Sequence, residues 1–217
     1  MMRPYYEQDG VVIYHGDCRD VLPRVAADVL VTDPPYGITH ACHRGATWNG
    51  TVIAHDADTL CRDAVLEGWG SRPAIVFGSW RQPRPTATRE VLVWDKGPAS
   101  GMGDLRFPWK RSWEEIYILG DGFTGPRDEG VLKGYVVLTW ETRGRAHPNM
   151  KPETLLTHLI TKCPPGRILD PFMGSGTTLV AAKRLGRQAI GIEINEQYCE
   201  IAAERLAQRA LPFEASA

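Results

Sequence analysis

Hydrophobic residues gather in short runs along the chain, and several runs are continuous rather than alternating with polar residues. The runs are rich in β-branched residues, which favour strands. Because alternation marks a strand with one wet face, continuous runs indicate strands that are buried on both faces. This pattern predicts eight strands: Val11–Tyr14, Val29–Val31, Ala74–Phe77, Val91–Trp94, Ile116–Leu119, Tyr135–Leu138, Ile168–Leu169 and Ala189–Ile192.

Three stretches in the C-terminal part show helical spacing instead: residues 153–162, 177–185 and 196–208. The last of them carries one stripe made of Tyr198, Ile201, Ala202, Arg205 and Leu206. Strands that alternate with helices predict an α/β fold with helices on both faces of a mostly parallel sheet. Residues 37–57 and 95–112 mix glycine, proline and polar residues and predict long loops, which in compact domains are functional or disordered.

A length of 217 residues, of which 43% are hydrophobic, predicts one globular domain spanning residues 1–217. No apolar run approaches the roughly 18 residues of a membrane span, and the N-terminus lacks the apolar core of a signal peptide. We therefore expect no membrane association. The five cysteines are an odd number without a Cys-x-x-Cys pair, which favours reduced thiols and a cytoplasmic location.

The formal net charge of −1 does not by itself favour nucleic-acid binding, because phosphate neutralisation dominates such affinity. The charges are unevenly distributed, however. Residues 1–71 carry 5 basic and 10 acidic side chains, whereas residues 72–111 carry 8 basic and 3 acidic ones. This basic middle segment indicates a surface for an anionic partner, with a merely solvated face as the alternative.

The segment Asp33-Pro34-Pro35-Tyr36 directly follows a predicted strand. Its prolines remove backbone donors and stiffen the turn, so the Asp33 carboxylate and the Pro34 carbonyl point rigidly outward. Two acceptors placed in this way suit an exocyclic amino group on a base, which offers two N–H donors. Tyr36 adds a flat face on which a base can stack. A proline-stiffened turn without further function is the alternative interpretation.

A second motif, Asp170-Pro171-Phe172-Met173-Gly174-Ser175-Gly176-Thr177-Thr178, connects a predicted strand to a predicted helix. Glycines there let the backbone turn sharply and approach a ligand beyond the end of the strand. Glu193 ends the next strand and is suited to accept hydrogen bonds from ribose hydroxyls. A phosphate-binding loop would need Gly-Lys-Ser/Thr, and a dinucleotide site would need a third glycine where Leu179 stands.

In this order, the two motifs resemble those of the β-type S-adenosylmethionine-dependent DNA amino-methyltransferases, which methylate adenine N6 or cytosine N4. Two further segments fit the resemblance: His15-Gly16-Asp17-Cys18 and His147-Pro148-Asn149-Met150-Lys151-Pro152. The resemblance spans about residues 10–210 and implies a Rossmann-like, doubly wound sheet. It divides the chain into a catalytic half (about 10–119), a short recognition segment (about 120–146) and a cofactor half (about 147–210).

The resemblance also implies roles for individual residues. Catalysis falls to Asp33, Pro34, Pro35 and Tyr36. Binding of S-adenosylmethionine falls to Asp17, Cys18, Asp33, His147, Lys151, Asp170, Phe172, Gly174, Ser175, Gly176, Thr177, Thr178 and Glu193. We expect no metal, because the cluster of His40, Cys42 and His43 fits no zinc spacing. No covalent intermediate is needed, and the chain lacks the Pro-Cys pair of cytosine-C5 methyltransferases.

The implied substrate is double-stranded DNA from which the target base is flipped out. The aspartate that opens the first motif favours adenine N6, since cytosine-N4 members more often begin with serine. Cytosine N4 stays open as an alternative, as does a catalytically inactive partner subunit. RNA and protein-glutamine methyltransferases are disfavoured, because they usually carry asparagine at this place and have the cofactor loop first.

The basic segment and the loop after Tyr36 supply the predicted DNA contacts, at Arg44, Arg81, Arg84, Arg106, Trp109, Lys110 and Arg111. β-type members hold a target-recognition region between their two halves, and here only about 25 residues are available for it. Three alternatives remain: relaxed recognition, recognition by residues 37–57 and 95–112, or recognition completed by the second subunit of a homodimer.

Overall fold

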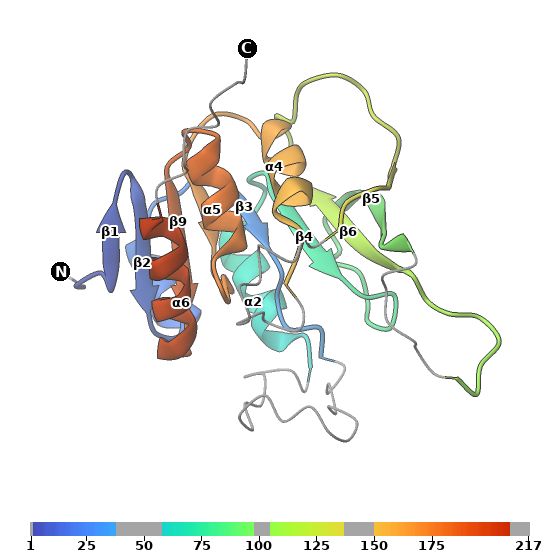
Figure 1. Ribbon diagram of the computed structural model, residues 1–217, viewed down its shortest axis with the longest axis horizontal. Coiled ribbons are helices and arrows are strands. Elements are labelled where there is room, and N and C mark those ends of the chain that lie inside the picture. Colours follow the sequence, from blue (N-terminus) through green and yellow to red (C-terminus); the bar gives the residue numbers. More distant parts are fainter. Residues whose placement is uncertain (1, 38–57, 98–104, 137–149, 209–217) are drawn as a thin grey trace, which may run out of the picture.

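The computed structural model describes residues 2–37, 58–97, 105–136 and 150–208. Within these ranges, nine strands form one sheet in the order β1-β2-β9-β8-β3-β4-β6-β5-β7 (Figure 1). The strands are β1 Tyr6–Gln8, β2 Val11–His15, β3 Val29–Thr32, β4 Ala74–Gly78, β5 Thr88–Asp95, β6 Trp113–Leu119, β7 Val131–Leu132, β8 Ile168–Asp170 and β9 Ala189–Glu193.

The centre of the sheet is parallel: β2, β9, β8, β3 and β4 all run in the same direction. The flanking strands β1 and β6 are antiparallel to their neighbours. Every residue of β3 and of β4 is buried, which explains why these strands read as continuous apolar runs. The predicted mostly parallel, Rossmann-like sheet is confirmed.

Helices cover both faces of this sheet. One face carries α4 Glu153–Thr161, α5 Thr177–Arg184 and α6 Glu196–Ala207, whose Leu155, Leu179 and Ala202 belong to one hydrophobic cluster. The other face carries α1 Cys18–Val21, the 3-10 helix η1 Leu22–Arg24 and α2 Leu60–Trp69, which contribute Val21 and Val65 to a second cluster. The layers follow from the pleat, since alternate residues of each strand point to opposite faces.

The predicted elements agree with the structure in most places. The three predicted helices end within one residue of α4, α5 and α6. The predicted strand at Tyr135–Leu138 is wrong where it can be compared, because Tyr135 and Val136 belong to no strand. The strand of this region is β7, two residues long, and Gly134 with its φ of +80° ends the extended backbone just after it.

Five elements of the described chain were not predicted: β1, α1, η1, α2 and β7. The helix α2 buries Cys61, Arg62, Val65 and Trp69. Because this buried stripe includes a charged arginine, it does not form the apolar pattern that predicts an amphipathic helix. The strand β1 is a short antiparallel partner of β2 with mostly exposed residues. Across the described parts of the chain, no helix is long and apolar enough to cross a membrane.

The C-terminal ends of the parallel central strands lie along one edge of the sheet, which we call the carboxyl edge. Asp33 follows β3, Ser79 follows β4, Asp170 ends β8 and Glu193 ends β9. Because β6 is antiparallel to β4, its first residues also lie here, and Glu115 is opposite Gly78. In doubly wound sheets this edge is where ligands bind.

Candidate active site

The first motif leaves β3 at the carboxyl edge in a fixed conformation. Pro34 is buried and Asp33 is partly buried, directly after the fully buried strand. The turn ends at Gly37, whose φ is +67°. A Cβ atom at this position would lie 2.5 Å from the carbonyl carbon of Asp58, so glycine is the residue that allows this close approach.

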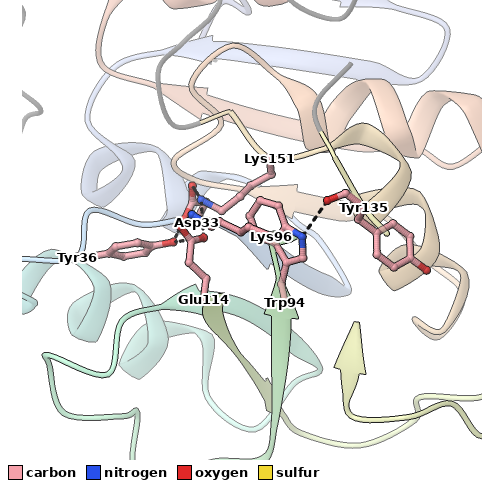
Figure 2. Close-up of polar contacts among 7 residues, drawn as sticks. All are labelled: Asp33, Tyr36, Trp94, Lys96, Glu114, Tyr135 and Lys151. Atoms are coloured by element: carbon pink, nitrogen blue, oxygen red, sulfur yellow. Dashed lines mark hydrogen bonds and ion pairs between the residues drawn. The ribbon is translucent and has the colours of Figure 1, made fainter. Parts of the chain in front are cut away.

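The Asp33 carboxylate has a partner on each oxygen. The hydroxyl of Tyr36 donates to Oδ1 at 2.6 Å, and the ammonium of Lys151 donates to Oδ2 at 2.5 Å. Figure 2 shows these side chains converging from the turn after β3 and from the segment before α4. The carboxylate is therefore held in one orientation, as a preorganised acceptor requires.

Glu114, near the start of β6, extends this arrangement into a small ionic network. Its carboxylate forms ion pairs with Lys96 and with Lys151, the latter at 3.4 Å, and the Tyr36 hydroxyl lies 3.4 Å from it (Figure 2). We call Asp33, Tyr36, Lys96, Glu114 and Lys151 the Asp33 cluster. It holds two carboxylates and two ammonium groups, so its formal charges balance, as buried charges require.

The surroundings shift the pKa values of the cluster. Burial alone would raise the pKa of Glu114, but the ammonium groups of Lys151 and Lys96 outweigh it and hold that pKa below its usual value. Burial alone would lower the pKa of Lys151, yet Asp33 and Glu114 raise it. Burial and the two carboxylates raise the pKa of Tyr36 well above its ordinary value. Tyr36 therefore stays a donor at neutral pH.

The second motif forms the turn between β8 and α5, and Asp170 ties that turn to the first motif. The Thr32 hydroxyl donates to the Asp170 carboxylate at 2.7 Å, and the Phe172 backbone N–H donates at 3.1 Å. Asp170 is almost fully buried, and this burial raises its pKa to about 6, opposed by the hydrogen bonds from Thr178, Thr32 and Phe172. Its side chain thus joins the strand that precedes Asp33 to the glycine turn.

Glu193 supports the same turn from β9. Its carboxylate accepts the backbone N–H of Gly174 at 3.0 Å and that of Asn195 at 2.8 Å. Burial raises the pKa of Glu193, although these backbone N–H groups oppose the rise. The Ile194 backbone N–H is a third donor to this carboxylate. A carboxylate has about four lone-pair sites, so these three bonds leave it capacity to accept a ribose hydroxyl.

Asp17 lies beside Glu193 because β2 and β9 are neighbours. His15 is the register partner of Glu193, and the Gly16 N–H donates to the Glu193 carbonyl at 2.9 Å. The Asp17 side chain caps α1 by accepting the Arg19 N–H at 2.9 Å. The structure therefore brings Asp17, Cys18 and Glu193, which the resemblance placed around the cofactor, to one end of the carboxyl edge.

Arg205 of α6 clamps the turn from outside. Its guanidinium donates to the Ser175 carbonyl at 2.6 Å and to the Thr177 hydroxyl at 3.1 Å. Gly176 has a φ of +77°, and a Cβ there would lie 2.7 Å from the Cβ of Ala202 in the same helix. The stripe of α6 was predicted as apolar, but its arginine binds the turn instead of packing a core.

The predicted DNA-contact residues occupy different surroundings. The guanidinium groups of Arg81 and Arg111 lie 5.9 Å and 5.5 Å from the Trp80 ring. Arg106, Trp109 and Lys110 belong to the exposed stretch 105–111. Arg84 forms an ion pair with buried Glu115 at 2.6 Å. The sequence predicted Arg84 as a DNA contact from its charge and did not predict this ion pair. Arg44, His147 and the cluster His40, Cys42 and His43 lie outside the described residues.

Sequence reasoning missed three residues that the structure places at the site: Lys96, Glu114 and Arg205. Lys151, which the resemblance implies for S-adenosylmethionine binding, donates its ammonium to Asp33 in the structure. The signal for Glu114 and Lys96 lies in strand pairing, because β5 and β6 are antiparallel and pair Asp95 with Trp113. No motif spacing carries that information.

Comparisons with known proteins agree with this geometry. A family model described as DNA methylase matches residues 108–204. The putative methylase YubD of Escherichia coli K12 is 32% identical over 216 residues, covering 90% of this chain and 91% of YubD. The Type II methyltransferase M.ScaI of Streptomyces caespitosus is 28% identical, covering 96% of this chain and 85% of M.ScaI.

Solved structures show the same fold at lower identity. M1.HpyAVI superposes with a TM-score of 0.64 at 23% identity, covering 92% of this chain and all of that one. The cytosine-N4-specific PvuII DNA methyltransferase superposes with a TM-score of 0.65 at 15% identity, covering 96% of this chain and 90% of that one. The identity to YubD over nearly the whole length decides the family. The chain belongs to the N6/N4 family of DNA amino-methyltransferases.

Proposed function

We propose that the protein transfers a methyl group from S-adenosylmethionine to the exocyclic amino group of a base flipped out of double-stranded DNA, with adenine N6 as the target. One observation carries the proposal: Asp33 with its fixed carboxylate and the glycine turn after β8 are joined by the Thr32–Asp170 hydrogen bond. A methyl acceptor site and a methyl donor site are thereby held at one edge of the sheet.

The chemistry follows from the amino group. Its nitrogen lone pair is delocalised into the base ring, so it is a poor nucleophile until the nitrogen becomes pyramidal. The Asp33 carboxylate and the Pro34 carbonyl accept its two N–H groups and favour that geometry. The lone pair is then free to form a new N–C bond, and S-adenosylmethionine, if bound at the glycine turn, would supply the electrophilic methyl group and leave as a neutral thioether. The extra proton on nitrogen leaves to the base within reach, the Asp33 carboxylate.

Lys151 and Tyr36 prepare Asp33 for this role. The ammonium of Lys151 donates to one oxygen of the carboxylate and fixes it, and the Tyr36 hydroxyl fixes the other. Each carboxylate oxygen retains a lone pair for the incoming amino group. The ring of Tyr36 lies with its centroid 5.5 Å from the Lys151 nitrogen, beside the place where the base has to enter.

The residues at the glycine turn fit a nucleoside-like methyl donor. Gly174 adopts a φ of +50° and Gly176 one of +77°, so the turn presents backbone without side chains. Glu193 and Asp17 sit at the far end, where ribose and adenine would lie. When bound, S-adenosylmethionine supplies an electrophilic methyl group. The M1.HpyAVI complex with this donor has the same fold, with a TM-score of 0.63 at 22% identity, which supports the assignment.

One alternative has specific support, and a second is disfavoured. The fold neighbour PvuII methyltransferase is cytosine-N4-specific, and a site with two acceptors suits the amino group of cytosine as well as that of adenine. An inactive partner subunit would need no ordered acceptor, whereas both oxygens of Asp33 have donors here. The aspartate at the head of the motif, which the family associates with adenine, decides our preference.

The test is methyl transfer with identification of the product. Purified protein is incubated with unmethylated genomic DNA and S-adenosylmethionine labelled in the methyl group, and the DNA is digested to nucleosides. We expect the label in N6-methyladenine. Label in N4-methylcytosine would transfer the proposal to the cytosine alternative, and unlabelled DNA alongside measurable cofactor binding would favour the inactive subunit.

A further inference from the structure

An aromatic and basic surface lies beside the Asp33 cluster, and the mechanism does not use it. Trp80, Phe107 and Trp109 are 55%, 62% and 75% exposed. Arg81 and Arg111 place their guanidinium groups near the Trp80 ring. We call these three rings, with Arg81, Arg106, Lys110 and Arg111, the aromatic surface.

Exposed rings in this number need an explanation. Large apolar side chains are rarely left in water in a cluster unless they form a binding site. From Leu105 to Arg111 every residue is exposed, and apolar residues at 105, 107 and 109 are interspersed with basic ones at 106, 110 and 111. The rings of Phe107 and Trp109 lie 5.5 Å apart at an interplanar angle of 59°, so they contact each other without burying their faces.

The register of the sheet places this surface next to the reacting groups. Trp80 lies two residues after β4, and β4 is the neighbour of β3, which ends at Asp33. Arg111 lies two residues before β6 and reaches Trp80 across the same edge. Figure 1 shows the segment that leads into β6 from residue 105 extending away from the sheet at the lower right. The surface thus continues outward from the Asp33 cluster.

We propose that the aromatic surface stacks unpaired nucleotides of the DNA strand that flank or oppose the flipped base. The inference rests on the proposed function and adds a substrate property to it: the protein binds single-stranded or locally opened DNA more tightly than intact duplex. Stacked bases in a duplex hide their faces, so exposed rings gain contacts only when bases are unpaired.

The charges select this occupant over others. Four basic side chains accompany the three rings, and the described residues 105–111 contain no acidic one. A second copy of the chain docked through the same surface would bring these cations against one another. Aromatic rings with cations between them are the usual composition of a site for single-stranded nucleic acid.

The test uses a fluorescein-labelled oligonucleotide of twenty thymidines, which holds neither adenine nor cytosine and so offers no methylatable amino group. Its affinity is measured by fluorescence anisotropy without cofactor. Trp80→Ala and Trp109→Ala should each weaken binding about tenfold, and Trp109→Phe should restore most of the loss. Annealing the oligonucleotide to its complement should weaken binding to the parent protein and largely remove the effect of the substitutions.

The matched control is Tyr5→Ala, which removes a ring that is 40% exposed beside β1, an edge strand separated from β4 by four other strands of the sheet. It should leave affinity unchanged. Equal affinity of the parent and both tryptophan variants would overturn the inference. It would also be overturned if the only effect of the tryptophan substitutions were to convert a dimer of the protein into monomers. Methyl transfer is measured on the same proteins. Transfer without ring-dependent binding refutes this inference alone, whereas ring-dependent binding without transfer refutes only the proposed function.

Discussion

At the scale of single residues, Asp33 is the group on which the proposed chemistry depends. Asp33→Ala should lower kcat at least about 10²-fold, the usual effect of removing one preorganised group, and lower cofactor affinity far less. Single-turnover methyl transfer and calorimetry with S-adenosylmethionine measure the two effects. Asp33→Asn, which keeps the shape but not the charge, is the control. Retention of more than about a tenth of the activity by the alanine variant contradicts the role.

Glu114 should act on Asp33 through Lys151, as a positioning residue. Glu114→Gln removes one of the two carboxylates that raise the pKa of Lys151. The folded pKa of Lys151 lies above its ordinary value, so its ion pairs stabilise the protein at lower pH and are lost as the pH rises through that pKa. In the variant this loss should begin at lower pH.

We therefore expect the alkaline limb of the kcat profile, and the alkaline decline in urea stability, to move to lower pH in Glu114→Gln. Glu90→Gln, an exposed carboxylate on β5, is the control. If Glu114 has only a structural role, the Glu114→Gln variant should be less stable at every pH, and the alkaline limb of its kcat profile should stay where it is in the parent.

Asp170 makes a different pH prediction, because burial raises its pKa from 3.8 to about 6. Between these values the folded state holds a proton that the unfolded state has released, so stability falls as the pH rises. Relative to Asp170→Asn, which cannot titrate, the free energy of unfolding of the parent should fall by roughly 2 kcal/mol from about pH 4.5 to about pH 7. Urea unfolding at both pH values measures it, and parallel stabilities would show that Asp170 does not titrate there.

At the scale of elements, the sequence predicted best where one signal dominates. The buried strands β3 and β4 and the helices α4 to α6 have strong periodicity, so their types and approximate bounds follow from the pattern alone. The helix α2 was missed because its buried stripe includes Arg62, which is buried through contacts with Asp63 and the Pro83 carbonyl. The contact with the Pro83 carbonyl is tertiary, so the local sequence pattern around Arg62 does not indicate that this residue is buried.

The contact between α6 and the glycine turn yields a prediction for a whole element. Arg205→Ala should weaken cofactor binding about tenfold, because the turn loses two donors to Ser175 and Thr177. Arg205→Lys keeps the charge and a donor, and should lose less. Calorimetry measures the affinities, and hydrogen exchange of residues 172–178 should speed up in the alanine variant. Unchanged affinity would reduce Arg205 to a packing role.

At the scale of the whole molecule, the site depends on contacts between distant parts of the chain. The motifs predicted Asp33, Asp170 and Glu193 as candidate site residues, because each stands in a short recognisable pattern at a strand end. The bond between Thr32 and Asp170 joins residues 138 positions apart, and the approach of Glu114 and Lys151 to Asp33 depends on strand order. Spacing within a motif cannot encode such distances, so these partners required the fold.

The overall charge distribution leads to the last prediction. The protein has a net charge of −1, yet residues 72–111 carry 8 basic and 3 acidic side chains, so DNA affinity should depend on a few of these basic residues. Replacing Lys110 and Arg111 by Ala should lower affinity similarly for every duplex and reduce the salt slope by about one to two counterions.

Replacing Arg3 and Arg24 by Ala is the control, because it removes the same charge near β1 and in η1 and should leave the salt slope unchanged. Anisotropy titrations from about 50 to 200 mM salt separate local contacts from net charge. If both double variants lower affinity equally, net charge alone governs binding and the basic segment is only a solvated face.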